Sequence, residues 1–158
     1  MEQIKIAKLL KIFSVLTGIV GGIFFFWYTP LFIEEVAYMN GLEWLRWPGT
    51  FGIWAIALIC YIALYYFWKI CIQIGEGNSF CRENAYSMKV ICFLAILASI
   101  AVLFGDITLA ILHFLNGAMI VFSFFIIFVG CGIACICFAL SKLIENAMMI
   151  KEENDLTV

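Results

Sequence analysis

The sequence predicts an all-α integral membrane protein, in which four transmembrane helices form one bundle and both termini lie in the cytoplasm. Three observations predict this class. The 158 residues are 66% hydrophobic and only 13% charged, whereas soluble domains average about 45–50% apolar and about 25% charged residues. The apolar residues gather in four long runs. With those runs as spans, the positive charges concentrate on the side of the termini.

A chain of this length cannot hide such an apolar excess inside a globule, because small domains leave much of their surface exposed. Lipid is therefore its solvent, and residues 1–158 are expected to form a single domain. The net charge is -2, so the overall balance shows no basic footprint for direct nucleic-acid binding.

The first span is expected over about residues 9–28. A short amphipathic segment precedes it, in which Lys5, Lys8 and Lys11 share one helical face. Proline lacks a backbone N–H and disfavours a helical residue before it, so Pro30 is expected to end this helix.

Residues 29–49 form the longest connection and are expected to lie on the membrane surface as a loop, with room for a short interfacial helix. The connection is acidic and aromatic; it carries Glu34, Glu35, Tyr38, Glu43, Trp44 and Trp47. Trp and Tyr favour the boundary between membrane and water.

The second and third spans are expected over about 50–69 and 87–104. Between them, residues 75–78 read Gly-Glu-Gly-Asn, a turn sequence. Ser79 is the expected N-cap of the next helix. Gly105–Asp106 is expected to mark the far end of the third span, and Asp106 to cap the segment after it, whose limits within 105–116 the sequence leaves open.

The fourth span is expected over about 117–140, and it runs on without a Pro or Gly break into an extension and tail, 141–158. One helix from Gly117 to Ile150 is about 50 Å long at ~1.5 Å per residue, whereas the hydrocarbon core is about 30 Å thick. The extension carries an apolar stripe made of Leu140, Leu143, Ile144, Ala147 and Met148. Either the N-terminal segment and the 70–86 hairpin cover this stripe, or a partner's groove does.

The nine cations divide eight to one across the predicted membrane. Those on the side of the termini are Lys5, Lys8, Lys11, Lys69, Arg82, Lys89, Lys142 and Lys151, and Arg46 lies opposite. Cytoplasmic loops are enriched in Lys and Arg. The sequence therefore predicts a multi-pass protein of the cell membrane with both termini inside.

Small residues predict where helices approach closely. Gly18 and Gly22 match the small-xxx-small pattern of membrane helices. They are expected to pack within the protein's own bundle, with a homo-oligomeric seam as the alternative. Gly130 and Ala134 make a similar surface on the fourth span and are a candidate for what Gly18 and Gly22 contact.

The interior of the predicted spans contains no Asp, Glu, Lys, Arg or His between Ile12 and Ile33, Pro48 and Trp68, Val90 and Gly105, or Phe114 and Ser141. Coupled transporters normally keep an ionisable residue at depth. No nucleophile–base arrangement and no phosphate-binding glycine loop is visible, so no enzyme activity and no cofactor is predicted. The sole histidine, His113, is expected to be an interfacial polar residue, with a pH sensor or a ligand as the alternative. The seven cysteines are expected to act as small hydrophobes; the alternative is a thiolate centre at Cys131, Cys135 and Cys137.

Two segments resemble a known family. Residues 75–85, Gly-Glu-Gly-Asn-Ser-Phe-Cys-Arg-Glu-Asn-Ala, and the ending 143–158, closing Lys-Glu-Glu-Asn-Asp-Leu-Thr-Val, resemble a domain-of-unknown-function family of small four-span bacterial membrane proteins. This chain has Ser79 and Cys81 where the family usually has Pro and Ser or Thr. Family members are commonly encoded beside a very small helix-turn-helix regulator. The resemblance therefore implies a plasma-membrane partner that holds or modulates a transcription factor.

The leading hypothesis is a non-enzymatic regulatory or adaptor protein whose cytoplasmic face binds such a small DNA-binding regulator. The residues expected to form this face are Phe80, Arg82, Glu83, Asn84, Met148, Glu152, Glu153, Asn154, Leu156 and Thr157. The alternative is an immunity protein that resists a membrane-active peptide through the outer loop 31–47. A membrane thiol or quinone oxidoreductase is a third hypothesis.

Overall fold

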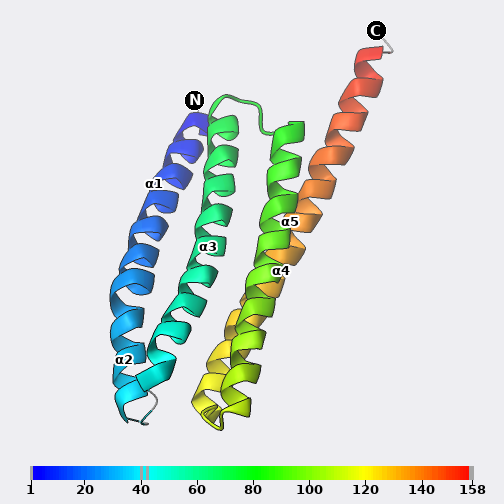
Figure 1. The fold of residues 1–158 in the computed structure, drawn as a ribbon. Coiled ribbons are helices and arrows are strands. Elements are labelled where there is room, and N and C mark those ends of the chain that lie inside the picture. The colour runs from blue at the N-terminus through cyan, green and yellow to red at the C-terminus, as the bar shows by residue number, and fades with distance from the viewer. Residues whose placement is uncertain (1, 40, 42, 157–158) are drawn as a thin grey trace.

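The computed structural model describes residues 2–39, 41 and 43–156, and within these ranges all regular structure is helical (Figure 1). The elements are α1 (Glu2–Gly22), the π-helix η1 (Ile23–Tyr28), α2 (Thr29–Met39), the 3-10 helix η2 (Glu43–Leu45), α3 (Arg46–Gly75), α4 (Arg82–Ile111) and α5 (Gly117–Leu156). In the described part, four helical segments are long and apolar enough to cross a membrane. The all-α, four-span prediction is confirmed.

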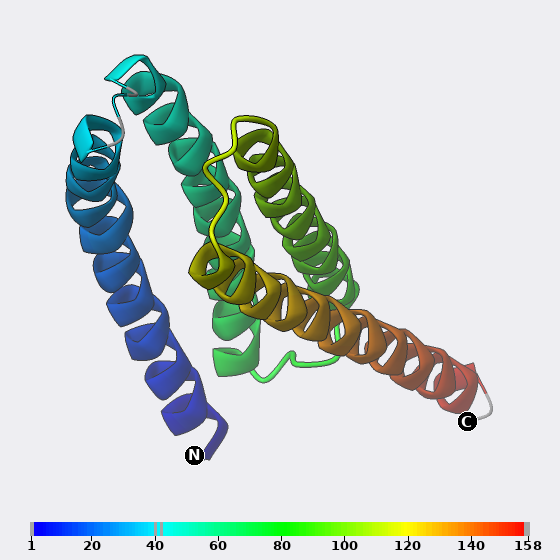
Figure 2. The same cartoon turned by 90° about the horizontal axis from the view of Figure 1, so that it is seen from below.

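The helices pack in chain order. α1 lies on α3, α3 on α4 and α4 on α5, and within the described residues α1 and α5 do not approach each other (Figures 1 and 2). Both termini and the α3–α4 connection lie at one end of the molecule, which we call the terminal end. The turn before α3 and the α4–α5 connection lie at the opposite, far end.

The helix of the first span does not end at Pro30, and the prediction that it would is wrong. We call the continuous helical segment α1–η1–α2 the first rod. The chain widens into η1 just before the proline, so the Thr29 N–H bonds to the Phe24 carbonyl. In that register the Phe25 carbonyl would need the N–H that Pro30 lacks. The indole N–H of Trp54 on α3 donates to it instead, at 3.2 Å, so the helix continues into α2.

The connection expected as a surface loop is mostly helical. α2 carries the chain to Met39, Gly41 adopts a positive φ of 67° in the turn, and η2 leads into α3. An ion pair closes this end: Arg46 Nη2 on α3 lies 2.8 Å from Glu34 Oε2 on α2. A helix is therefore present in this connection, but it continues α1 and η1 instead of standing apart from them.

The hairpin between α3 and α4 differs from the expected one at its cap. α4 begins at Arg82 with Cys81 in the N-cap position, so Ser79 is not the cap. The side chain of Asn84, only 2% exposed, donates from Nδ2 to the Ser79 carbonyl at 2.9 Å. The loop is thus held by an amide reaching back from the helix.

α4 runs through Gly105–Asp106 to Ile111, so the helix does not end at that pair; of the two forms open for residues 105–116, a tight loop or further helical turn, the chain adopts the helix as far as Ile111. Asp106 does not cap the next helix; its Oδ1 accepts a hydrogen bond from Ser123 Oγ on α5, at 2.8 Å. Asn116 fills the capping role, because its Oδ1 accepts the Met119 N–H at 2.9 Å. An ionisable side chain therefore lies within an apolar helix, where none was expected.

A seven-residue repeat aligns α4 with α5. The positions that meet are Cys92, Ser99 and Asp106 on α4, and Cys137, Gly130 and Ser123 on α5, and the same spacing reaches back to Ala85, whose carbonyl accepts Ser141. Asp106 bonds Ser123, Cys92 packs at the cluster containing Cys137, and Ser99 lies directly against Gly130. A strict repeat of seven gives a left-handed seam, and small residues let the two backbones approach closely.

Gly18 and Gly22 pack on α3, so their expected contact with Gly130 and Ala134 is wrong. The Tyr61 hydroxyl donates to the Gly18 carbonyl at 2.7 Å. A Cβ at Gly22 would lie 3.0 Å from the Tyr61 hydroxyl oxygen. Glycine is therefore needed on α1 because a tyrosine of α3 lies against its backbone, whereas Gly130 and the buried Ala134 face α4.

Candidate functional site

α5 is longer than a membrane requires. Its 40 residues span about 60 Å at ~1.5 Å per residue, about twice the ~30 Å hydrocarbon core. The expectation of one helix through Ile150 is confirmed and extended to Leu156. Figure 1 shows the end of α5 standing beyond the start of α4. With 117–140 as the span, residues 141–156 project at the terminal end, and we call them the extension.

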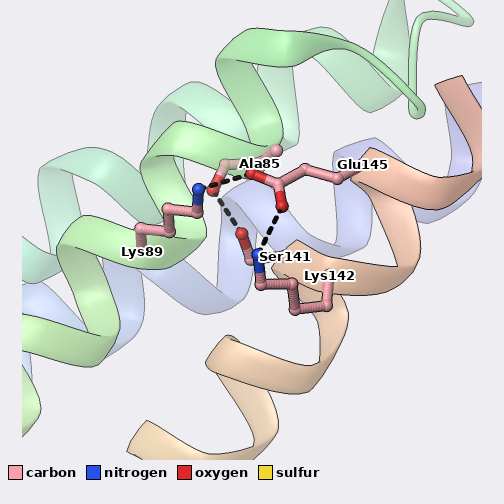
Figure 3. A network of polar contacts seen from close by, with 5 residues as sticks. All are labelled: Ala85, Lys89, Ser141, Lys142 and Glu145. Carbon is pink, nitrogen blue, oxygen red and sulfur yellow. Dashed lines mark hydrogen bonds and ion pairs between the residues drawn. The ribbon is translucent and has the colours of Figure 1, made fainter. Parts of the chain in front are cut away.

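A polar network fixes the base of the extension to α4 (Figure 3). Ser141, which is fully buried, donates from Oγ to the Ala85 carbonyl at 3.0 Å. The Glu145 carboxylate forms ion pairs with two lysines: Lys89 of α4, and Lys142 of its own helix, whose Nζ lies 3.0 Å from Glu145 Oε2. Hydrogen bonds from Lys89 and then Lys142 lower the pKa of the Glu145 carboxyl below its ordinary value. We call Ala85, Lys89, Ser141, Lys142 and Glu145 the clamp.

The clamp divides the extension into two faces. Ser141 and Ile144 are buried and Met148 is half-buried. The apolar side chains on the remaining surface are exposed: Leu143 by 61%, Met149 by 55% and Ile150 by 60%. The predicted stripe is therefore only partly covered. Its cover is the beginning of α4, and the expected contribution of the N-terminal segment is absent among the described residues.

The hairpin residues of the predicted partner face separate into two kinds. Phe80 is 64% exposed, and Arg82 and Glu83 are also exposed. Asn84 is buried and holds the loop through its amide. Three of these four side chains are accessible at the terminal end, whereas Asn84 has a structural task.

The tail residues lie at the outer end of the extension. Glu152 and Glu153 are exposed, and Met148 is half-buried against the body of the protein. Asn154 and Leu156 belong to the last turns of α5, and Thr157 lies outside the described residues. The apolar and acidic groups of the extension thus follow one another along a single helix.

Sequence reasoning missed the clamp. Lys142 and Glu145 are three residues apart, a spacing that predicts a pair on one helix face. Lys89 and Ala85 lie 56 residues before their partners Glu145 and Ser141, and no local pattern joins them.

The cysteines do not gather into a centre. Cys131 and Cys135 are exposed on the lipid side of α5, whereas Cys137 is buried against α4. All seven cysteines are free thiols, and no group of three or more His, Cys, Asp or Glu side chains suited to a metal occurs among residues 2–39, 41 and 43–156.

Four apolar helices with a projecting, clamped extension define a multi-pass membrane protein. The chain belongs to the family described as "Protein of unknown function (DUF2975)", which matches residues 31–158. It is similar to a Bacillus subtilis (strain 168) protein named "Uncharacterized membrane protein YoaS", with 29% identity over 133 residues, covering 83% of this chain and 79% of that protein. No solved structure matches.

Proposed function

We propose that this protein is a non-enzymatic regulatory or adaptor protein of the bacterial plasma membrane, and that its extension binds a small helix-turn-helix regulator. The observation that carries the proposal is the division of the extension by the clamp. One face is fixed to α4, and the other presents exposed Leu143, Met149 and Ile150 to the surroundings. An exposed apolar strip on a helix is a standard docking element for another helix or groove.

Charge favours a basic partner. Glu152 and Glu153 lie exposed just beyond the apolar strip, and a DNA-binding domain is typically basic. An anionic lipid surface would repel the same carboxylates. Members of the family that this chain resembles are commonly encoded beside a helix-turn-helix regulator, which supports the same class of partner.

The proposal places both termini in the cytoplasm. The connection 76–81 lies with the termini at one end (Figure 1), and eight of the nine Lys and Arg residues belong to that side. Such an excess is typical of the cytoplasmic face. A regulator of transcription would then meet the extension on the correct side of the membrane.

A paired substitution tests the proposal. Ile150→Asp should abolish retention of the purified cognate regulator by the full-length protein in nanodiscs, because it places a charge in the strip without altering the clamp. The matched control is Lys151→Asp, which introduces the same side chain at the neighbouring exposed polar position. A substitution inside the span, such as Phe138→Asp, would not serve as a control because it would disturb membrane insertion. Equal regulator binding by Ile150→Asp and the unaltered protein would contradict the proposal.

A further inference from the structure

Three tyrosines and Lys69 gather at the terminal end between α3 and α4. The Lys69 ammonium lies 5.2 Å from the ring centre of Tyr65 and 5.7 Å from that of Tyr66. The Tyr66 ring meets the Tyr86 ring of α4 edge to face, with centres 6.5 Å apart. We call these residues, together with Arg82, the tyrosine–cation cluster.

Helical spacing places Arg82 on the side of α4 that carries Tyr86. Arg82 lies four residues before Tyr86, so both side chains belong to the same side of α4. α3 and α4 are antiparallel, and the Tyr66–Tyr86 contact sets their register. Because the helices run in opposite directions, Ile70, four residues after Tyr66, lies at the level of Arg82, four residues before Tyr86. Lys69 precedes Ile70 and therefore lies at nearly the same level as Arg82.

The cluster lies at the depth of lipid headgroups. Lys69 follows Arg46 by 23 residues along one continuous helix, which is about 35 Å at ~1.5 Å per residue. Arg46 marks the far boundary with its partner Glu34. A hydrocarbon core of about 30 Å therefore ends close to Lys69, in the zone where tyrosines are enriched.

The polar groups of the cluster have unused bonding capacity. Among the described residues, neither Lys69 nor Arg82 has a carboxylate partner, although Arg46, Lys89 and Lys142 each have one. The Tyr61 hydroxyl bonds the Gly18 carbonyl. The hydroxyls of the cluster, by contrast, make no hydrogen bond within the described part of the chain; these are Tyr65, Tyr66 and Tyr86.

We propose that the tyrosine–cation cluster binds the phosphate group of an anionic phospholipid from the leaflet at the terminal end. The two cations neutralise the phosphate charge, and the phenolic hydroxyls donate hydrogen bonds to its oxygens. Basic pockets between membrane helices are suited to such headgroups. This site lies on α3 and α4, apart from the exposed face of the extension, and it does not depend on the proposed regulator.

Native mass spectrometry of the full-length protein, extracted from phosphatidylcholine vesicles containing phosphatidylglycerol, tests the site. Retained phosphatidylglycerol should fall about fivefold in Lys69→Gln and in Arg82→Gln, the effect of one interfacial cation on attraction to an anionic leaflet. Tyr66→Phe, which removes only the hydroxyl, should give a smaller loss. Lys8→Gln removes an exposed charge of the same sign on α1, also at the terminal end of the molecule, and should leave retention unchanged.

Two results would overturn the assignment. An equal loss in Lys8→Gln and Lys69→Gln would mean that general surface charge attracts the lipid, without a site. Release of the bound lipid by inorganic phosphate would mean that the cluster takes the free anion. Circular dichroism that matches the unaltered protein ensures that each loss reports binding, since all the substituted side chains except Tyr66 are exposed.

Discussion

The α1–α3 pair and the α4–α5 pair are both antiparallel membrane helices, yet they are held together by different means. Backbone carbonyls at Gly18 of α1 and Phe25 of η1 accept hydrogen bonds from the large side chains Tyr61 and Trp54 of α3. Between α4 and α5 the contacts are made by small residues in a seven-residue repeat, with Asp106 bonded to Ser123 within the seam.

The difference matters because helices in lipid gain no hydrophobic driving force from touching each other. The first pair relies on two large polar side chains: Trp54 bonds the Phe25 carbonyl, which Pro30 leaves without a backbone donor, and Tyr61 bonds the Gly18 carbonyl. The second relies on close approach at small residues, as where Ser99 and Ala95 lie against Gly130. We infer that the second pair is the rigid unit, and that the clamp extends this rigidity beyond the bilayer to the base of the extension.

The largest effect is expected from overfilling the small-residue seam. A Cβ at Gly130 would collide with Ser99 Oγ, whereas a Cβ at Gly132 meets nothing within 4 Å. Gly130→Leu should lower the free energy of unfolding by about 1–3 kcal/mol or more, measured by denaturant titration in mixed micelles. Gly132→Leu on the same helix is the control; equal loss in both variants would break the comparison.

A second effect should appear in the α1–α3 pair. Trp54→Phe removes the donor to the Phe25 carbonyl, which Pro30 leaves without a backbone partner. A fully buried acceptor left without a partner costs about 1–3 kcal/mol; this bond is part-buried, so stability should fall by about 1 kcal/mol and amide exchange should rise around residues 24–29. Trp47→Phe, at an exposed aromatic position, serves as control. Unchanged exchange in Trp54→Phe would mean that the π-helix does not need the indole.

The Asp106–Ser123 bond should contribute less. Interhelical hydrogen bonds in a membrane average about 0.6 kcal/mol, so a double-mutant cycle with Asp106→Ala and Ser123→Ala should return a coupling of that order. A coupling near zero would show that the repeat alone sets the register of α4 on α5.

The clamp should have the smallest effect on stability, because its ion pairs are partly exposed and salt screens them. Its effect should be on motion: a spin label at Ile150 should become more mobile in Glu145→Gln and not in Glu152→Gln. The pKa of Glu145 is lowered in the folded protein. The clamp is therefore intact above the ordinary pKa of a glutamate and is lost as the pH falls through the lowered value. If the mobility of the label changes neither in Glu145→Gln nor at low pH, the clamp does not hold the extension.

The four helices and the extension could be predicted from the sequence, because the apolar runs and the cations carry that information locally. The continuation of the helix through Pro30 could not be predicted, because the Phe25 carbonyl is bonded by Trp54, which lies 29 residues away in the sequence. The repeat from Ala85 to Asp106 is visible in the sequence and could have indicated a helix through Gly105. Nothing local indicated that α1 would pack on α3 alone, or that Lys89 would reach Glu145.

The most direct test of the central claim is photocrosslinking in native membranes from two positions on opposite faces of the extension, Ile144 and Ile150. Ile144 is buried against the protein and Ile150 is exposed. We expect Ile144 to crosslink to the chain's own α4, and Ile150 to capture a small basic DNA-binding protein identified by mass spectrometry. Crosslinks from Ile150 only to residues 75–86 of the same chain would contradict it, because the extension would then merely complete the bundle.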